Sequence, residues 1–407
     1  MRYESVFLVG WHHIWSGAVD GVVYSLTEGF RRAGYYAQSI IFKANEVPAN
    51  FNELLRPTPC KLIIGITHTS LFVSIDGKRL WDLVKADFAT YFIDNPAFFA
   101  EDGLKHLLEA PEEMSFLFAD NAHKRQFQSY LLTKGRKNDC IFFPYGGNLY
   151  PRNEENAKDT INEVKITVFA NVGAETPQFF HGIRKGVKSL PLIKDSNLPN
   201  SAKDYIINQL PLCDYDYDLF DYFSSLTESR HLYLDQDTML LYLAADSYLK
   251  RCRRIFTVRE LKNFNVQIYG SGWSEVAGEI PPNWNLSESV SYSKQFDIFL
   301  DSDIILNVDP VWSEGIHDRV FNAMSCGAIP LTNYNKLTPF FLEHGINSLV
   351  YNSASEIPQL ISSNLPDLVK IKKTIRNTFH SLHTWRQRID SVIDRIYLRN
   401  DSRFSPL

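Results

Sequence analysis

Short apolar runs alternate with amphipathic segments along the whole chain. Runs of three to six residues bounded by polar turns predict strands that are buried on both faces. In the first part of the chain these runs are residues 6–9, 37–42, 61–66, 89–93, 116–119 and 140–144. Residues 10–20 are predicted to form a loop, and residues 21–33 a helix that ends at Gly34, which gives a βαβ unit. The pattern predicts a parallel sheet with helices on both faces and with functional loops at the carboxyl ends of its strands.

The pattern stops near residue 150 and then begins again. Residues 150–164 are polar, nearly free of large apolar side chains and opened by a proline, which is typical of a domain boundary. A second series of strands is predicted at residues 166–170, 266–269, 290–292 as a short edge, 304–307, 329–332 and 349–351. We therefore expect two α/β domains in series, residues 1–155 and 156–380, the second with a helix-rich segment at 178–261. Residues 356–397 are predominantly helical in pattern, and residues 381–407 are expected to pack back on the first domain as a C-terminal helix.

Composition narrows the class of protein. Of 407 residues, 44% are hydrophobic and 22% charged, as in a folded globular protein, and the formal charge of -5 gives no field that would attract nucleic acid. The five cysteines are widely spaced and form no C-x-x-C, so neither a disulfide framework nor a zinc knuckle is predicted, and reduced thiols indicate a cytoplasmic protein. No run approaches the roughly 18 apolar residues of a membrane span. The basic stretch from Lys370 to Arg403 is either a solvated helix face or a peripheral contact with anionic lipid headgroups.

A glycine turn follows one of the predicted strands. In the run VQIYGSGW, Gly270 and Gly272 lack side chains, so backbone N–H groups there can approach a phosphate or a nucleotide. A dinucleotide fingerprint needs a third glycine where Glu275 stands, so nicotinamide binding is not supported. The alternative is a plain tight turn between strand and helix.

A polar loop and a helix follow the strand at residues 304–307. A helix that begins near His317 would direct its first N–H groups and its positive dipole end toward the loop, and Arg319 adds a fork suited to phosphate oxygens. Together they predict a diphosphate site. The alternatives are a salt bridge of Arg319 to Asp318 or Glu314, and a solvated loop acid at Glu314.

The run GIHDRVFNAMSCGAIPLT, residues 315–332, resembles the donor-binding core of glycosyltransferases of the GT-B fold, most closely the group-1-like branch that includes CgeB-type spore maturation proteins. The late stretch His383-Thr384-Trp385 with Arg388 resembles the terminal helix motif of that branch. The resemblance implies two Rossmann-like domains facing a central cleft. It also implies transfer of a sugar from a nucleotide-diphosphate sugar to a glycan, lipid-linked or protein acceptor, with no metal and no further cofactor.

The same resemblance implies the donor residues. The base would lie near Gly270, Gly272 and Trp273, and the diphosphate near Asn307, His317, Asp318 and Arg319. In related retaining enzymes two glutamates touch the donor sugar and the ribose. Here Glu314 takes the first position and Asn322 the second, where an amide can still bond a ribose hydroxyl. Those relatives also place Arg and Lys after the first strand of this domain, whereas this chain has residues 171–175, NVGAE, so the stereochemical outcome stays open.

Several strand ends of the first domain offer a base for the acceptor hydroxyl. His13 and Asp20 follow the first strand and Asp94 the fourth, and each is either a general base or a satisfied polar loop residue. His12 and His13 have the wrong spacing for a metal site, and Asp214, Asp216 and Asp218 lie in a helix-rich segment that favours a solvated surface or a partner contact over metal binding. The alternatives to sugar transfer are a catalytically silent binding protein with the same fold, or a nucleotide-sugar epimerase or hydrolase.

Overall fold

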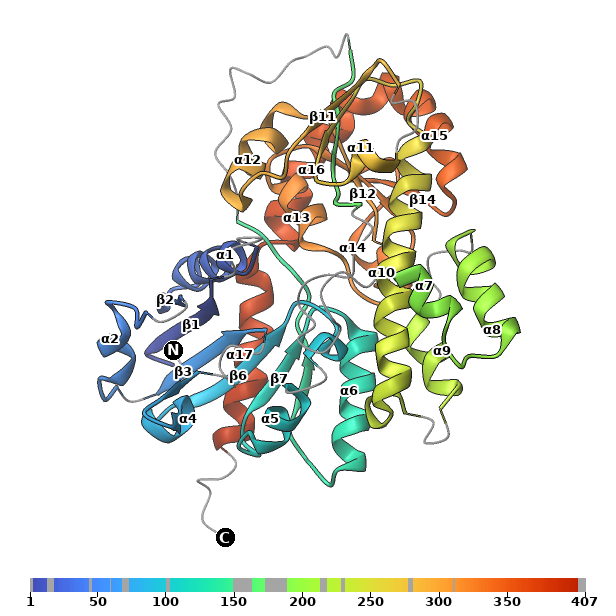
Figure 1. Ribbon diagram of the computed structural model, residues 1–407. Helices are drawn as coiled ribbons and strands as arrows, with labels where there is room; N and C mark the ends of the chain where they lie inside the picture. The colour runs from blue at the N-terminus through green and yellow to red at the C-terminus, as the bar shows by residue number, and fades with distance from the viewer. Residues whose placement is uncertain are drawn as a thin grey trace. The chain divides into compact units, whose positions relative to one another are not determined.

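The computed structural model describes residues 3–12, 18–43, 46–58, 60–67, 73–99, 103–148, 163–172, 189–212, 218–227, 231–276, 281–309 and 312–401. Contacts between residues divide the chain into two units (Figure 1). The first comprises residues 1–148, 291–293 and 382–407, and the second comprises residues 149–290 and 294–381. The first stretch of the first unit ends at residue 148, whereas the sequence predicts a domain boundary at residue 155. Residues 382–407 also belong to the first unit.

The first unit is built on a six-stranded sheet in the order β2-β1-β3-β6-β7-β8, in which every pair is parallel. The central strands β1, β3 and β7 are almost entirely buried because helices cover them, whereas the edge strand β2 is only partly buried. Its strands are β1 (Ser5–Trp11), β2 (Tyr36–Phe42), β3 (Lys61–Ile66), β6 (Asp87–Phe92), β7 (Ser115–Phe118) and β8 (Cys140–Phe142), with a separate hairpin of β4 (Ser74–Ile75) and β5 (Lys78–Arg79). Its helices are α1 (Ala18–Arg32), α2 (Phe51–Leu55), α4 (Leu80–Leu83), η1 (Pro96–Phe99), α5 (Gly103–Glu109), α6 (Asn121–Thr133) and α17 (Trp385–Asp401).

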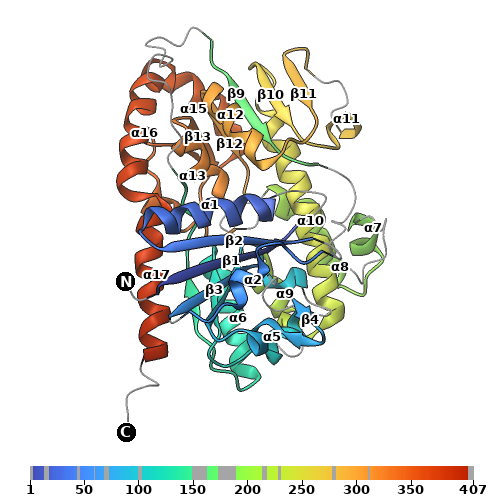
Figure 2. The same cartoon turned by 90° about the vertical axis from the view of Figure 1, so that its left-hand side faces the viewer.

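Helix α1 packs directly against β1 and β2 (Figure 2). A Cβ atom on Gly10 would lie 2.6 Å from Val23 Cγ2, so this glycine in β1 allows the close approach of the helix. Helix α17, drawn in red in Figure 1, packs against α1. The first and last parts of the chain therefore form one unit.

The second unit has a parallel six-stranded sheet of the order β11-β10-β9-β12-β13-β14. Its strands are β9 (Ile166–Phe169), β10 (Val266–Tyr269), β11 (Trp284–Ser287), β12 (Ile304–Asn307), β13 (Ile329–Asn333) and β14 (Leu349–Tyr351). The helices that follow β9 are α7 (Ser189–Lys194), α8 (Asn200–Asp204), η3 (Tyr205–Gln209), η4 (Leu210–Leu212), α9 (Leu219–Ser225), η5 (Leu232–Leu234) and α10 (Gln236–Arg259). The later helices are α11 (Trp273–Val276), α12 (Tyr292–Asp301), α13 (Asp318–Ser325), α14 (Thr338–Phe341), η6 (Ala354–Glu356), α15 (Ile357–Asn364), η7 (Leu365–Asp367) and α16 (Leu368–Leu382).

Two expected elements are wrong. The edge strand is residues 284–287, not 290–292, because Trp284 is buried and donates its indole N–H to Leu261 O, whereas Tyr292 begins the amphipathic helix α12. The loop predicted at residues 10–20 is shorter, since β1 continues to Trp11 and α1 begins at Ala18. Asp20 is therefore a residue of the first helical turn and not of a loop.

Both strand orders have a point at which the order along the sheet reverses. In the second unit the reversal lies between β9 and β12, and in the first it lies between β1 and β3. Ligands of doubly wound sheets bind outside the carboxyl ends of the strands at such points. Candidate ligand sites are therefore expected at the carboxyl ends of β9 and β12 and of β1 and β3.

Candidate functional site

The start of helix α13 follows the loop after β12. His317 is its N-cap, with extended backbone, and its Nδ1 lies 2.6 Å from Asp318 Oδ1 and 3.3 Å from the amide nitrogen of Arg319. The Arg319 amide therefore donates to the ring of its own N-cap residue, and the same ring lies against the Asp318 carboxylate.

Asp318 carries a charge at this helix start. Burial opposes its ionisation, but the charge and the hydrogen bond of His317, together with Arg319, outweigh burial and lower the pKa of the carboxyl group. A carboxylate in the first turn also interacts favourably with the helix dipole. Asp318 thus holds His317 in place and keeps the local charge balanced.

The guanidinium of Arg319 is fixed by the neighbouring strand. Its Nη1 donates to Asn307 Oδ1 at 3.1 Å, and Asn307 in turn donates its amide N–H to Thr332 Oγ1 at 3.0 Å. The Nε atom of Arg319 is buried and has no hydrogen-bond partner in the described part of the chain. Burial lowers the pKa of Arg319, partly offset by Asp318 and Asp309. A buried guanidinium with an unused donor at a helix N-terminus is suited to binding phosphate oxygens.

Asn171, which follows β9, is hydrogen-bonded to the loops after β10 and β11. Its Oδ1 accepts from the amide of Ser271 at 2.9 Å and from Ser289 Oγ at 3.0 Å, which ties the loop after β9 to the glycine turn after β10. A Cβ on Gly270, at φ +154°, would lie 2.0 Å from Ala170 O, so glycine is needed there for close approach of two backbones. Gly272 also has positive φ, at 83°. The glycine turn therefore lies beside the carboxyl ends of β9 and β10.

Trp273 has a packing role. Its ring is buried at 2% exposure, and its Nε1–H donates to Ala170 O at 2.7 Å. Both the face and the donor of this side chain are therefore used within the fold. Its expected contact with a nucleotide base has no support in this geometry.

Glu314 and Asn322 are both buried close to α13. Glu314 Oε1 lies 3.5 Å from Lys336 Nζ, and the loop on either side of Glu314 is held by Asn335, which donates to Trp312 O and Gly315 O at 3.1 and 2.6 Å. Asn322 donates to Asp318 Oδ2 at 3.3 Å, within its own helix. The structure therefore brings Glu314 to the helix start and turns the Asn322 amide toward Asp318.

In the first unit a histidine and a carboxylate meet at the end of β1. His12 Nδ1 is hydrogen-bonded to Asp20 Oδ2, and the other carboxylate oxygen is buried without a partner among the described residues. A carboxylate that fixes an imidazole is the arrangement that orients a general base. His13, another of the expected candidates for the base, lies outside the described residues. Asp94 is exposed after β6, next in the sheet to β3 and not at the strand-order reversal.

The sequence gives no sign of the place of Arg254 in α10. His12 is one of two neighbouring histidines in the sequence, and the structure sets it against Asp20. Arg254 Nη1 donates to Asn171 O at 2.9 Å. Nothing in an arginine-rich amphipathic helix such as RCRRIFTVR distinguishes this side chain, because tertiary packing alone brings it to β9.

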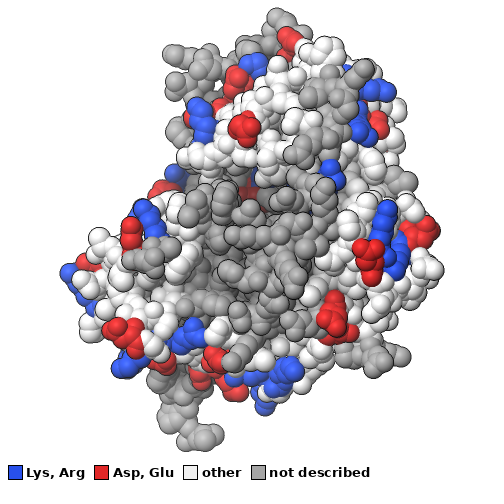
Figure 3. All heavy atoms as spheres, viewed as in Figure 1, with Lys and Arg blue, Asp and Glu red and all other residues white. Residues whose placement is uncertain are grey.

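The remaining predictions concern metal sites, membrane spans and the acidic residues of the helix-rich segment. Within them, no three His, Cys, Asp or Glu side chains are grouped as a metal site, and none of their helices is long and apolar enough to span a bilayer. Asp218 caps α9 and accepts from Ser313 Oγ at 3.2 Å, while Asp214 and Asp216 fall outside the description. On the face shown in Figure 3, basic and acidic side chains are interspersed among the described residues.

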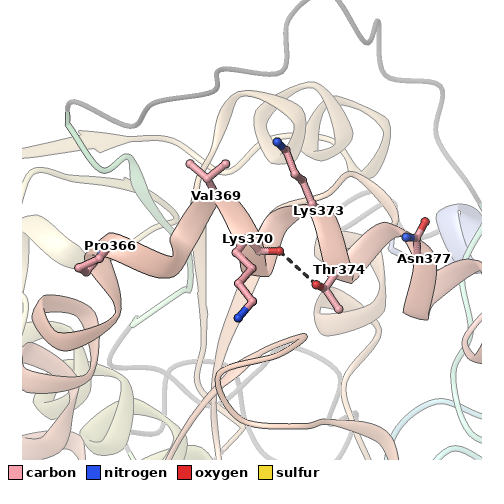
Figure 4. A pocket seen from close by; sticks show the side chains of 6 residues that line it. All are labelled: Pro366, Val369, Lys370, Lys373, Thr374 and Asn377. Atoms are coloured by element: carbon pink, nitrogen blue, oxygen red, sulfur yellow. Dashed lines mark hydrogen bonds between the residues drawn. The ribbon is translucent and has the colours of Figure 1, made fainter.

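A shallow surface pocket lies along α16, lined by Pro366, Val369, Lys370, Lys373, Thr374 and Asn377 (Figure 4). Figure 4 shows Lys370 and Lys373 leaving the helix in different directions, so they do not converge on one anion. Lys372 points inward and pairs with Asp303 at 2.5 Å. A lipid contact of this basic stretch stays a prediction.

One comparison with known proteins matches a part of the chain that includes α13. Residues 251–394 match the family model described as glycosyl transferase-like. No curated protein matches the sequence. The structure of HepE from Anabaena in complex with UDP and glucose aligns over 97% of this chain and 99% of its own, at 9% identity and a TM-score of 0.52.

Two further solved structures are similar. Sucrose-phosphate synthase from Thermosynechococcus elongatus aligns over 97% of this chain and 100% of its own, at 11% identity and a TM-score of 0.51. TarM aligns over 85% of this chain at 10% identity and a TM-score of 0.45, and the chain spans 56% of TarM's length. At such identities the likeness concerns the fold. The predicted pair of Rossmann-like sheets of the GT-B type is confirmed, and the CgeB-type branch stays a hypothesis.

Proposed function

We propose that this protein is a glycosyltransferase that takes a sugar from a nucleotide-diphosphate sugar and transfers it to an acceptor hydroxyl. The observation that carries the proposal is the buried guanidinium of Arg319, whose Nε has no partner among the described residues and which lies in the first turn of α13. Support comes from the glycosyl transferase-like match over residues 251–394. HepE, of similar fold, has been crystallised with UDP-glucose, so UDP-sugars are the first donors to test.

The donor diphosphate would be held by the second unit. Phosphate oxygens would accept hydrogen bonds from the Arg319 guanidinium and would lie at the positive end of the α13 dipole. As the bond between the anomeric carbon and the phosphate oxygen breaks, the leaving diphosphate keeps the electron pair, and these donors stabilise the added charge. This stabilisation needs no metal.

The acceptor would be activated in the first unit. His12, oriented by Asp20, would take the proton of the attacking hydroxyl while its oxygen forms the new bond to the anomeric carbon. Asp20 would stabilise the resulting imidazolium without itself taking the proton. Glu314, buried beside α13, would accept hydrogen bonds from the donor sugar.

The experiment measures binding and turnover separately. The purified protein is titrated with UDP, GDP, dTDP and CDP and their glucose or mannose conjugates in a thermal-shift assay, because a ligand of the native state raises its apparent stability. Arg319→Gln should lower the affinity for the nucleotide that binds wild type by about 10- to 100-fold, as expected for loss of a charge-assisted hydrogen bond. Lys294→Gln, on the exposed side of α12, is the matched control.

Turnover distinguishes the alternatives. With donor and an acceptor panel, wild type should release nucleoside diphosphate and glycosylated product, and His12→Ala should lose transfer while it keeps nucleotide affinity. Release of free sugar alone would favour a hydrolase, and a changed sugar still on the nucleotide an epimerase. The absence of any nucleotide binding by the wild type would overturn the proposal.

A further inference from the structure

Two arginines from distant parts of the chain are anchored at adjacent strand ends. β9 and β12 pair in parallel with Leu306 opposite Val168, so Asn307 is level with Phe169. Arg319 is bonded to Asn307 and Arg254 to the carbonyl of Asn171, two residues beyond Phe169. Neighbouring strands lie about 4.8 Å apart. Both guanidinium groups therefore reach the same strand-order reversal of the second sheet.

These two positive charges are only partly compensated. Arg254 interacts electrostatically with Arg319, and both interact with Asp309, whose backbone amide is held by Asn333 Oδ1 at 2.7 Å. Asp246 also attracts Arg254, but it is buried and already paired with Lys250 at 2.8 Å. The two guanidinium groups thus share Asp309, and Asp318, the stronger attraction on Arg319, is already hydrogen-bonded to His317 at 2.6 Å.

The cost of this arrangement can be seen at Arg254. Burial, and then the charge of Arg319, lower the pKa of Arg254 to about 10. A pKa below the ordinary value means that the surroundings disfavour the charged form. An anion bound between the two guanidinium groups would offset the repulsion between them, so the binding of an anion and the charging of the pair favour each other.

We propose that Arg254 is a second diphosphate-binding residue, which approaches the donor site from α10 and binds the diphosphate together with Arg319. The inference rests on the proposed function, since it names a further ligand of the same site. One guanidinium serves each side of a two-phosphate group, so Arg254 should matter for the second phosphoryl group and little for a nucleoside monophosphate. Arg254 is therefore a determinant of diphosphate specificity.

Arg251 provides a matched control on the same helix. Its Nε donates to the carbonyl of Val172 at 3.1 Å, next to the carbonyl that Arg254 bonds. Its charge acts on Tyr248 and Cys252. Loss of either arginine removes a bond to the loop after β9, but only the Arg254 variant removes charge from the pair.

The test compares affinities for inorganic pyrophosphate, for the nucleoside diphosphate that binds wild type, and for its monophosphate. Arg254→Gln should lower the affinity for the diphosphate and for pyrophosphate by 10-fold or more, and the affinity for the monophosphate by less than 3-fold. Arg251→Gln should change all three affinities by less than 3-fold. Arg254→Lys, which keeps the charge, should fall between wild type and Arg254→Gln. It also provides the comparison if Arg254→Gln does not fold.

The outcomes separate this inference from the proposed function. Equal diphosphate affinity in wild type and Arg254→Gln would overturn the role of Arg254, and so would an equal loss of mono- and diphosphate affinity, which a merely structural role would produce. Failure of wild type to bind any nucleotide would instead overturn the proposed function. In that case pyrophosphate alone still tests the pair, and no difference between wild type and Arg254→Gln would refute it.

Discussion

The indole Nε1 of Trp385 donates a hydrogen bond to Ser25 Oγ at 2.9 Å and so joins α17 to α1 across 360 positions of the chain. The ring is buried at 2% exposure against Phe143 and Tyr145. Gly29 on α1 provides the space, because a Cβ there would lie 2.4 Å from Trp385 Cβ. The C-terminal helix is thus fitted to the first unit at one specific point.

Trp385 and Gly29 should therefore be sensitive to small changes. We expect Gly29→Ala to lower the free energy of unfolding by about 1–2 kcal/mol, since overpacking outweighs the gain in helix propensity, and Trp385→Ala to lower it by about 3–5 kcal/mol. Urea unfolding followed by far-ultraviolet circular dichroism measures both. Tyr24→Ala, at an exposed position of α1, is the control, and an equal effect there would contradict the packing argument.

The terminal motif has a structural role in this arrangement. Gly147 N donates to His383 O and Trp385 N to Gly147 O, at 3.1 and 3.0 Å, while Arg388 Nε donates to Tyr145 O at 3.3 Å. Every one of these contacts lies within the first unit. The motif attaches α17 to the loop after β8.

The strands could be predicted because burial on both faces leaves a local signature. Residues 61–66 and 304–307 are apolar runs with a definite beginning and end, and the structure has strands with the same bounds. The edge strand at 284–287 has no such run, since only Trp284 of its four residues is buried. The apolar pattern therefore does not locate it.

The candidate site could be predicted only where its residues are close in sequence. His317, Asp318 and Arg319 lie on one helix turn, and their order alone suggests a phosphate site. The loop after β9 lacks the Arg and Lys that the related enzymes have there. We propose that Arg254, which is 83 positions from Asn171, supplies the positive charge instead. The pairing of His12 with Asp20 depends likewise on where α1 begins, because that places the carboxylate against the ring.

Asn335 should affect turnover more than donor binding. Besides its bonds to Trp312 O and Gly315 O, its Oδ1 accepts from the amides of Leu337 and Thr338 at 2.9 and 3.0 Å. Asn335→Ala would leave these buried groups unpaired, at a cost of about 2–4 kcal/mol, and would loosen the loop that carries Glu314. We expect kcat to fall at least 10-fold with nucleotide affinity within 3-fold of wild type.

The control for Asn335 is Asn347, another buried asparagine, whose Oδ1 accepts from the amide of Glu343 at 2.7 Å. Asn347→Ala should cost stability without changing kcat. Equal kcat losses in the two variants would show that general destabilisation, and not the position of Glu314, causes the effect.

Thr67 stores backbone strain at the end of β3. Its φ of +61° is unfavourable for a β-branched residue, and its amide donates to Tyr91 O at 2.7 Å. Thr67→Gly should raise the free energy of unfolding by about 0.5–1 kcal/mol and reduce transfer, because β3 adjoins β1 at the strand-order reversal that also carries His12. Cys60→Gly relieves similar strain at φ 51° on the opposite end of β3 and should stabilise without loss of activity. A Thr67→Gly enzyme with full activity would mean that the strain has no part in the site.

The ionisation of Asp318 gives a stability effect with a defined pH window. Its pKa in the folded protein is below the ordinary 3.8, so as pH falls the unfolded chain takes up the proton first. The stabilisation is therefore complete above pH 3.8 and is lost as pH falls through the lower, folded pKa. At pH 7, Asp318→Asn should reduce the free energy of unfolding by about 1–2 kcal/mol, through loss of the charged bond to His317 and of the dipole interaction. Urea unfolding at pH 7, 5, 4 and 3 should show the difference between wild type and variant closing only below pH 4. Asp297→Asn, whose partner Lys294 is exposed, should show no such difference at any pH, and a gap at Asp318 that widens in acid would reverse the sign of the argument.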